Sequence, residues 1–296
     1  MILYPNSIMM TDRHREIVQS QEKDFPYTAM EASLNLYAGK STPWHWHDHF
    51  EMAIVLYGRV EVFSQQGSVI LHPGEGYFLN ANVLHMSRAV DQNACLRAQL
   101  FTRELISGTG LVTRRYISTV ENCPNIVMQI LKPENPAHRD ILNEFSAAFV
   151  AAEGDVSGHE ILICAHIAAA WGGLFRQLED KILNSHGVPR EDVLRAKAML
   201  NYIHENYVHP VSVRQIASAA GICERECFRC FAEILDTTPM ICLNRHRIGI
   251  AARALAETSL PIARIAEDCG FSSSGYFGKV FRQMMGCTPS EYRKNR

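Results

Sequence analysis

The sequence of 296 residues has no long hydrophobic run, no secretion signal and no strong net charge. A membrane-spanning helix needs about 18 consecutive apolar residues, and the nearest candidate, residues 161–175, is shorter and contains His166. The N-terminus becomes polar before the apolar core of a signal peptide could form. With 47% hydrophobic and 20% charged residues, the composition excludes a disordered chain. We therefore expect a soluble, cytoplasmic protein without a membrane partner.

The net charge of −2 hides a difference between two parts of the chain. Residues 1–189 contain 14 Lys and Arg against 20 Asp and Glu, whereas residues 190–296 contain 15 against 11. Many solvated helical surfaces carry a similar excess of basic residues. An acidic part followed by a basic part nevertheless favours two domains, of which the second would face a polyanion.

Nine cysteines occur without a secretion signal, which favours reduced thiols. Cys223, Cys227 and Cys230 have the C-x3-C-x2-C spacing of radical enzymes that hold an iron–sulfur cluster. Such an enzyme needs a parallel α/β barrel, whereas the flanking pattern is helical throughout. Since positions i, i+4 and i+7 share one inward helix face, we expect three small core residues. A redox-sensitive thiol is the alternative.

The hydrophobic pattern changes its period along the chain. Between residues 27 and 100, short alternating runs separated by glycines predict the strands of a small barrel or sandwich. Beyond residue 104, apolar residues at three- and four-residue spacing predict helices. The helix predicted at residues 158–183 is apolar nearly all round, so more than one neighbour must cover it. Either a subunit interface or packing under the barrel would do so. The predicted regions are a barrel with an N-terminal arm (1–104), a helical dimerisation region (105–184), a linker (185–192) and an all-helical domain (193–296).

The last hundred residues contain an internal repeat. Both copies have an Ile-Ala pair, a Gly, a Phe and a Thr-Pro pair in the same order: Ile216, Ala217, Gly221, Phe231, Thr238 and Pro239, then Ile265, Ala266, Gly270, Phe281, Thr288 and Pro289. The small Ala lets a second helix cross closely, and the Gly allows a left-handed turn before it. The repeat therefore predicts two helix-turn-helix units, at about 213–233 and 262–284, each with a helix that fits the major groove of DNA.

Residues 195–296 resemble the DNA-binding domain of AraC/XylS-type bacterial transcription regulators. The runs over residues 264–282 and 286–293 follow that family's signature, and residues 247–255 match the helix that joins its two units. The first unit departs from the pattern, because Cys223, Cys227 and Asp236 replace Ser, Leu and Gly. Since Cys caps a helix poorly, we expect this unit to be less rigid.

The resemblance also implies which residues meet DNA. The base-contacting positions of the family fall on Arg225, Arg229, Ser274, Gly275 and Lys279, and we expect Arg282 to contact a phosphate. The recognition helices, starting near residues 224 and 273, should enter successive major grooves about 34 Å apart. The expected partners are double-stranded DNA and RNA polymerase.

A second motif lies in the predicted strands. His45, His47 and Glu51 share strand parity, so their side chains point to one face. Their spacing, with flanking Gly39 and Gly58, matches the first sequence motif of cupin barrels, and residues 74–85 resemble the second motif in part.

The cupin resemblance implies a ligand site inside the barrel. AraC-type regulators often use such a barrel to sense a small ligand, which gives the effector site His45, His47, Glu51, Tyr77 and His85. Alternatively, His45, His47, Glu51 and His85 form a donor set that suits a divalent transition metal. Trp44 and Trp46 have the opposite parity and are expected to pack.

These expectations combine into a multidomain α and β protein with an N-terminal cupin-like β-barrel, a helical dimerisation segment and a C-terminal all-α domain with two helix-turn-helix motifs. The predicted function is a homodimeric, sequence-specific DNA-binding transcription regulator. A small-molecule effector, such as a sugar or related metabolite, would control it without catalysis and without a required cofactor. The alternatives are a metal-dependent cupin enzyme using Fe²⁺ or Mn²⁺, and a thiol or metal sensor with a DNA-binding tail.

Overall fold

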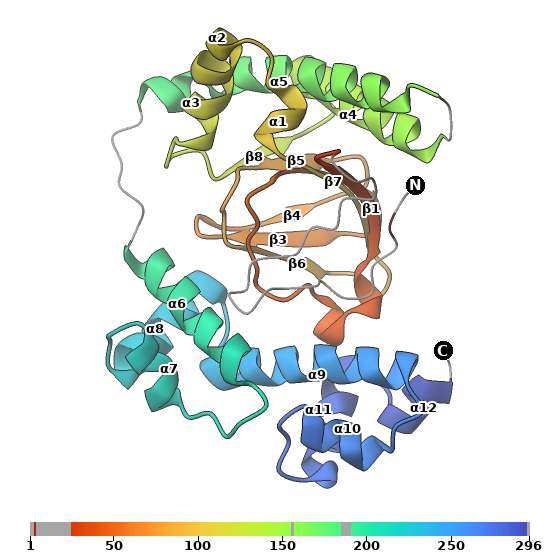
Figure 1. Cartoon of the computed structure of the whole chain (residues 1–296), viewed down its shortest axis with the longest axis vertical. Coiled ribbons are helices and arrows are strands. Elements are labelled where there is room, and N and C mark those ends of the chain that lie inside the picture. The colour runs from red at the N-terminus through yellow and green to blue at the C-terminus, as the bar shows by residue number, and fades with distance from the viewer. Residues whose placement is uncertain (1–2, 4–24, 155–156, 185–190, 295–296) are drawn as a thin grey trace.

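Eight strands in the described part of the chain make up an N-terminal β domain. The computed structural model describes residue 3 and residues 25–154, 157–184 and 191–294. Figure 1 shows the β domain between two layers of helices. One antiparallel sheet has the strand order β1-β7-β2-β5-β8, and the other has the order β4-β3-β6. The strands are β1 (Tyr27–Ser33), β2 (Phe50–Tyr57), β3 (Val60–Ser64), β4 (Gly67–Leu71), β5 (Gly76–Leu79), β6 (His85–Ala89), β7 (Cys95–Phe101) and β8 (Met128–Leu131).

The strand β8 departs from the predicted division at residue 104. It belongs to the segment predicted as a helical dimerisation region, yet it pairs antiparallel with β5 from Leu79↔Met128 to Gly76↔Leu131. The chain reaches it through short helices, α1 (Arg103–Ile106), α2 (Gly110–Val112), η3 (Thr113–Ile117) and α3 (Ser118–Glu121). The region predicted for dimerisation, residues 105–184, therefore contributes a strand to the five-stranded sheet of the β domain.

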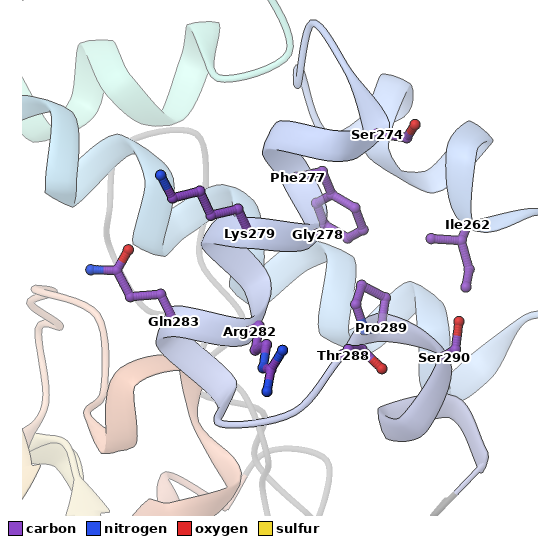
Figure 2. Close-up of a pocket in the computed structure, with 10 residues that line it drawn as sticks. All are labelled: Ile262, Ser274, Phe277, Gly278, Lys279, Arg282, Gln283, Thr288, Pro289 and Ser290. Atoms are coloured by element: carbon purple, nitrogen blue, oxygen red, sulfur yellow. The ribbon is translucent and has the colours of Figure 1, made fainter.

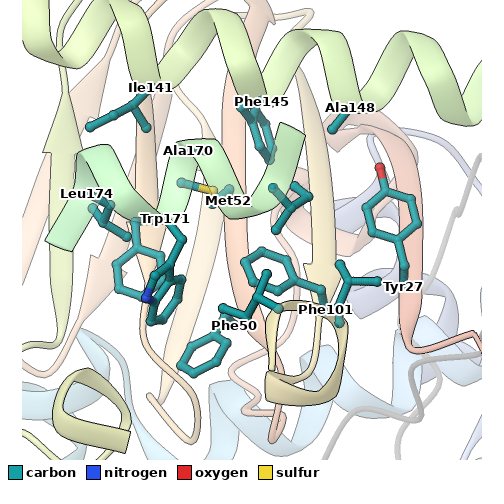
Figure 3. Packing of buried hydrophobic residues seen from close by; sticks show 14 of the residues in the cluster. Tyr27, Phe50, Met52, Phe101, Ile141, Phe145, Ala148, Ala170, Trp171 and Leu174 are labelled. Carbon is teal, nitrogen blue, oxygen red and sulfur yellow. The ribbon is translucent and has the colours of Figure 1, made fainter. Parts of the chain in front are cut away.

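Two long helices, α4 (Pro136–Glu153) and α5 (His159–Leu183), cover the five-stranded sheet. Asn135 accepts a hydrogen bond from the backbone of Ala137, and Pro136 occupies the first turn, so the sequence marks the start of α4. Figure 3 shows the side chains of these helices meeting the sheet, where Trp171 lies 4.7 Å from Phe50 between ring centroids. Among the described residues, α5 alone has the length and hydropathy of a membrane span, and its buried face packs on this core.

The alternation of β2 divides its side chains between two cores. Residues of even number pack under α4 and α5, and those of odd number face the second sheet. Glu51 has the second orientation and is 6% exposed. Strand pairing brings Tyr77 of β5 to the same interior. An isolated bridge between His45 and His85 places the first residue of β6 beside them.

The C-terminal domain is entirely helical, as predicted. Its two helix-turn-helix units are α7 (Val213–Ala219) with α8 (Glu224–Leu235) and α10 (Ile262–Asp268) with α11 (Ser274–Met285). The turns contain Gly221 at φ 67° and Gly270 at φ 79°. The repeated Thr-Pro pair begins the next helix: Thr238 accepts a hydrogen bond from the backbone of Ile241, and Pro239 follows it. The helices are α6 (Glu191–Asn206), α7 (Val213–Ala219), α8 (Glu224–Leu235), α9 (Pro239–Glu257), α10 (Ile262–Asp268), α11 (Ser274–Met285) and α12 (Pro289–Lys294). Of the predicted linker, residues 185–190 lie outside the described residues, and Glu191 and Asp192 belong to α6.

The β domain and the helical domain share an apolar core. Trp44, Trp46 and Met86 belong to the same buried cluster as side chains of α6, α8 and α9. The indole nitrogen of Trp44 donates a hydrogen bond to the carbonyl oxygen of Leu235, the last residue of α8, at 2.9 Å. Both tryptophans therefore pack, as expected, and the surface that they cover belongs to the helical domain.

Candidate effector site and nucleic-acid interface

Five polar side chains meet inside the β domain, and they are the five that the sequence predicted. His45, His47, Glu51, Tyr77 and His85 are all between 1% and 6% exposed. Nε2 of His47 and Nε2 of His85 lie 3.1 and 3.2 Å from the same carboxylate oxygen of Glu51. The hydroxyl of Tyr77 donates a hydrogen bond to the other oxygen at 2.6 Å. The carboxylate of Glu51 is thus the centre of the cluster.

Backbone carbonyls fix the orientation of the three imidazoles. Each Nδ1 lies within hydrogen-bond distance of a carbonyl oxygen: His45 with Pro43 at 2.8 Å, His47 with His49 at 2.9 Å and His85 with Val83 at 2.9 Å. Because a carbonyl can only accept, Nδ1 carries the proton, and the lone pair of a neutral ring is on Nε2. A cation bound between these two Nε2 atoms and the carboxylate oxygen would accept the lone pairs of both rings.

Burial and neighbouring charges shift two groups of the cluster. Burial, together with His85 and His47, holds the pKa of His45 well below its ordinary value. Burial acts to raise the pKa of Glu51, but hydrogen bonds with His47 and His85 outweigh it and hold that pKa well below its ordinary value. The site therefore combines a neutral His45 with an ionised Glu51.

The same residues fit a divalent transition metal. The ligand atoms of His45, His47 and His85 lie within 4.8 Å of one another, and no other group of three His, Cys, Asp or Glu in the described ranges offers such a site. Nδ1 atoms that donate to carbonyls are the usual outer support of imidazole ligands. Bound there, a metal ion would supply a positive charge opposite Glu51.

The prediction that Cys223, Cys227 and Cys230 are core residues is confirmed for two of the three. Cys227 and Cys230 are buried in the core under α8, and burial raises the pKa of Cys227 to about 12 and that of Cys230 to about 11. Cys223 is exposed, because it precedes α8 as its N-cap and makes no side-chain capping hydrogen bond. The expectation that all three share an inward face is therefore wrong for Cys223.

On α8, the two predicted arginines have different surroundings. Arg225 is exposed. The guanidinium of Arg229 contacts three carboxylates, Glu226 at 2.9 Å, Glu233 at 2.7 Å and Asp192 of α6 at 3.3 Å. Arg229 therefore joins α8 to α6.

On α11, the predicted residues Ser274, Gly275, Lys279 and Arg282 are all exposed. Three of them, Ser274, Lys279 and Arg282, line a groove of about 700 Å³ that Figure 2 shows between α11 and the start of α12. Gly275 lies beside them on the first turn of the helix.

Two exposed aromatic residues on the recognition helices were not singled out by the sequence. Phe228 on α8 is 45% exposed, and Tyr276 on α11 is 47% exposed. A pattern analysis assigns apolar residues to the core face. The internal repeat could have revealed that Phe228 is exposed. At an offset of 50, Phe228 corresponds to Gly278, and a position occupied by glycine in the other copy is not needed for core packing.

Two family models match the chain. The model of the AraC-like ligand-binding domain matches residues 28–167, and that of a helix-turn-helix domain matches residues 216–295. Over 286 residues the chain is 24% identical to the uncharacterized HTH-type transcriptional regulator YdeC of Bacillus subtilis, covering 95% of this chain and 96% of the relative. Over 263 residues it is 27% identical to the HTH-type transcriptional activator RhaS of Pectobacterium carotovorum, covering 85% and 87%.

Among solved structures, the chain is similar to fatty-acid-bound ToxT from Vibrio cholerae, with a TM-score of 0.49, 14% identity and coverage of 93% and 97%. The two family matches together span the β domain, most of the helical layer above it and both helix-turn-helix units. The chain therefore belongs to the AraC family of transcription regulators, with an N-terminal ligand-binding domain and a C-terminal DNA-binding helix-turn-helix domain.

Proposed function

We propose that a small-molecule effector binds around Glu51 inside the β domain and thereby sets the affinity of α8 and α11 for DNA. The observation that carries this proposal is the convergence of four buried side chains, His45, His47, Tyr77 and His85, around one carboxylate. A buried cluster of ionisable groups is often no more stable than an apolar interior of the same volume, even when its members are paired, which favours a binding role over a packing role. The effector shifts the population between two arrangements of the same chain.

We propose a divalent transition metal as part of this site, held by His45, His47, His85 and Glu51. A donor set of three imidazole nitrogens and one carboxylate suits such an ion better than it suits Mg²⁺ or Ca²⁺, which prefer oxygen ligands. The protein then senses and does not catalyse, in keeping with relatives that are named as transcription regulators.

The test combines metal analysis with DNA binding. Protein purified without chelator should contain about one metal ion per chain by mass spectrometry, and His47→Ala should lose it. The variant should also lose the response of DNA binding to metal addition while keeping basal affinity. Equal loss of basal affinity would assign His47 a folding role, and metal-free wild-type protein that does not respond to metal would leave these histidines as walls of an organic-effector site.

For the DNA interface, we propose that Arg225, Ser274, Lys279 and Arg282 contact the duplex directly, with Gly275 beside them. Arg229 contributes by positioning α8 against α6. RNA polymerase is the further partner of the bound complex, which forms in the cytoplasm. Arg282→Ala should weaken binding to all sequences alike and flatten its salt dependence, because a phosphate contact carries no base preference.

We also propose a homodimer through α5. Its outward stripe is apolar or small, with Ile161 74% and Leu162 51% exposed, followed by exposed Ala165, Ala168 and Ala169. Small residues at three- and four-residue spacing let a second helix approach closely. A second copy of α5 is the partner with matching chemistry.

A further inference from the structure

The outward surface of α8 consists of one ridge and one ion-pair network. Arg225, Phe228 and Ala232 are exposed and follow one another at i, i+3 and i+7, so they lie on one side of the helix. Phe228 is 45% exposed. An exposed apolar side chain is ordinary on a protein surface, so its exposure alone assigns it no role. Its place next to Arg225, on a helix that the proposed function places in the major groove, does.

The ion-pair network occupies the other side of this surface. Arg229 directs its Nε to Glu226, one terminal nitrogen to Glu233 and the other to Asp192 of α6. To reach a base, the guanidinium would have to give up these three carboxylates. The ridge side chains would enter a groove without first breaking these contacts, which favours them for base contacts.

The second unit has no equivalent of this ridge. At the repeat offset of 50, Gly275 replaces Arg225 and Gly278 replaces Phe228. A Cβ built on either glycine would meet no atom within 4 Å, so the surface of α11 is bare at both positions. Side-chain reading at these positions thus depends on α8.

We propose that Phe228 reads the C5-methyl group of a thymine in the major groove, next to a base contacted by Arg225. In the major groove, thymine is distinguished from cytosine by this methyl group, which apolar side chains including Phe contact. The inference rests on the proposed function, in which α8 enters the groove. Phe228 is then a specificity-determining residue, and Arg229 is a positioning residue.

The test removes the methyl group from the DNA and the ring from the protein. A duplex is selected from a random-sequence pool with the full-length wild-type chain, and each thymine is then replaced singly by deoxyuridine, which lacks only the C5-methyl group. With wild type, one such replacement per recognised half-site should weaken binding about fourfold, the value of one buried carbon. With Phe228→Ala, the same replacement should change the affinity less than 1.5-fold, because the ring is already gone.

Three matched variants make the result decisive. Arg225→Ala should weaken binding yet keep the fourfold methyl effect, and Phe228→Leu should keep most of it. Arg229→Ala should weaken binding to all sequences alike, without changing the preferred base at any position. Thermal unfolding of each variant checks that the fold is intact.

Two outcomes would overturn the inference at different levels. If Arg225→Ala weakens binding but the deoxyuridine profiles of wild type and Phe228→Ala coincide, Phe228 does not read a methyl group. If neither Arg225→Ala nor Phe228→Ala weakens binding, α8 does not lie in the groove, and the α8 part of the proposed interface is wrong.

Discussion

At the scale of single residues, Asp236 ends α8 in a left-handed conformation, with φ 44° and ψ 42°. The equivalent residue after α11 is Gly286, with φ 77°. A residue with a Cβ adopts this conformation at a cost of about 1 kcal/mol relative to glycine.

We therefore expect Asp236→Gly to raise the free energy of unfolding by about 1 kcal/mol, measured by thermal or denaturant unfolding of the full chain. Asp236→Asn removes the charge but keeps the Cβ, so it should give little of this gain. Gly286→Asp should destabilise the second unit by a similar amount. An unchanged stability in Asp236→Gly would show that other contacts compensate the strained backbone.

Single residues also show which contacts could be predicted from the sequence and which could not. Strand parity, a local rule, predicted that His45, His47 and Glu51 share one face, although His45 and His47 lie before β2. The resemblance to cupin barrels added Tyr77 and His85 to the cluster around Glu51. The partner of Arg229 could not be predicted, because Asp192 is 37 residues away and the two meet only through helix packing. Cys223 was assigned to the core because helical spacing was applied one residue before the helix begins.

At the scale of elements, α11 carries Gly278 in the middle of a helix, where glycine costs about 1 kcal/mol relative to alanine. An added methyl group would meet nothing in the chain and would extend into the groove of Figure 2. Such a bare surface suits close approach of the helix to DNA.

Gly278→Ala should consequently raise stability by about 1 kcal/mol while weakening DNA binding. Gly249→Ala in α9 is the matched control, since its added methyl group also meets nothing. It should give the same stability gain with unchanged DNA affinity. The measurements are thermal unfolding and a DNA titration, and an unchanged affinity in Gly278→Ala would mean that α11 does not approach the duplex through this face.

The segment before β2 joins the two domains. His45 and His47 point into the proposed effector site, while Trp44 and Trp46 pack on the helical domain, and Trp44 donates a hydrogen bond to the last carbonyl of α8. We therefore expect a shift of His45 on ligand binding to move Trp44. This alternation offers a direct mechanical link between the effector site and a recognition helix.

Trp44→Phe removes the indole donor but keeps an aromatic ring. We expect the variant to bind metal as wild type does, yet to show at least a fivefold smaller difference in DNA affinity between metal-loaded and chelator-treated protein, since typical couplings exceed fivefold. Trp46→Phe, which leaves the Trp44 hydrogen bond in place, should keep the difference. A full response in Trp44→Phe would exclude this route.

At the scale of the whole molecule, the outward stripe of α5 predicts the oligomeric state. Leu162→Glu places a charge in this stripe and should convert the proposed dimer to a monomer at micromolar concentration, because burying an unpaired charge is costly. Val150→Glu, an equally exposed apolar position on α4, is the control and should remain dimeric. Sedimentation of the full chain measures both, and a monomeric wild type would refute the proposed interface.

The parts of the fold that depend on residues close together in the sequence could be predicted, and those that depend on distant residues could not. The repeat located both helix-turn-helix units, because its landmarks are turn and cap residues that act within one unit. The contact of Trp44 with Leu235 spans 191 residues, and no periodicity encodes it. Strand β8 was missed for the same reason, since four residues among helices give no strand signal without the partner strand.

The pairing of β8 with β5 has a consequence for how the chain can be shortened. A fragment that stops near residue 104 would leave the backbone N–H and C=O groups of β5 without their neighbour and would present an open sheet edge. Open edges recruit strands from other molecules and lead to aggregation. A soluble fragment of the ligand-binding half must therefore include residues 128–131 and the two helices that follow, even where only the effector site is of interest.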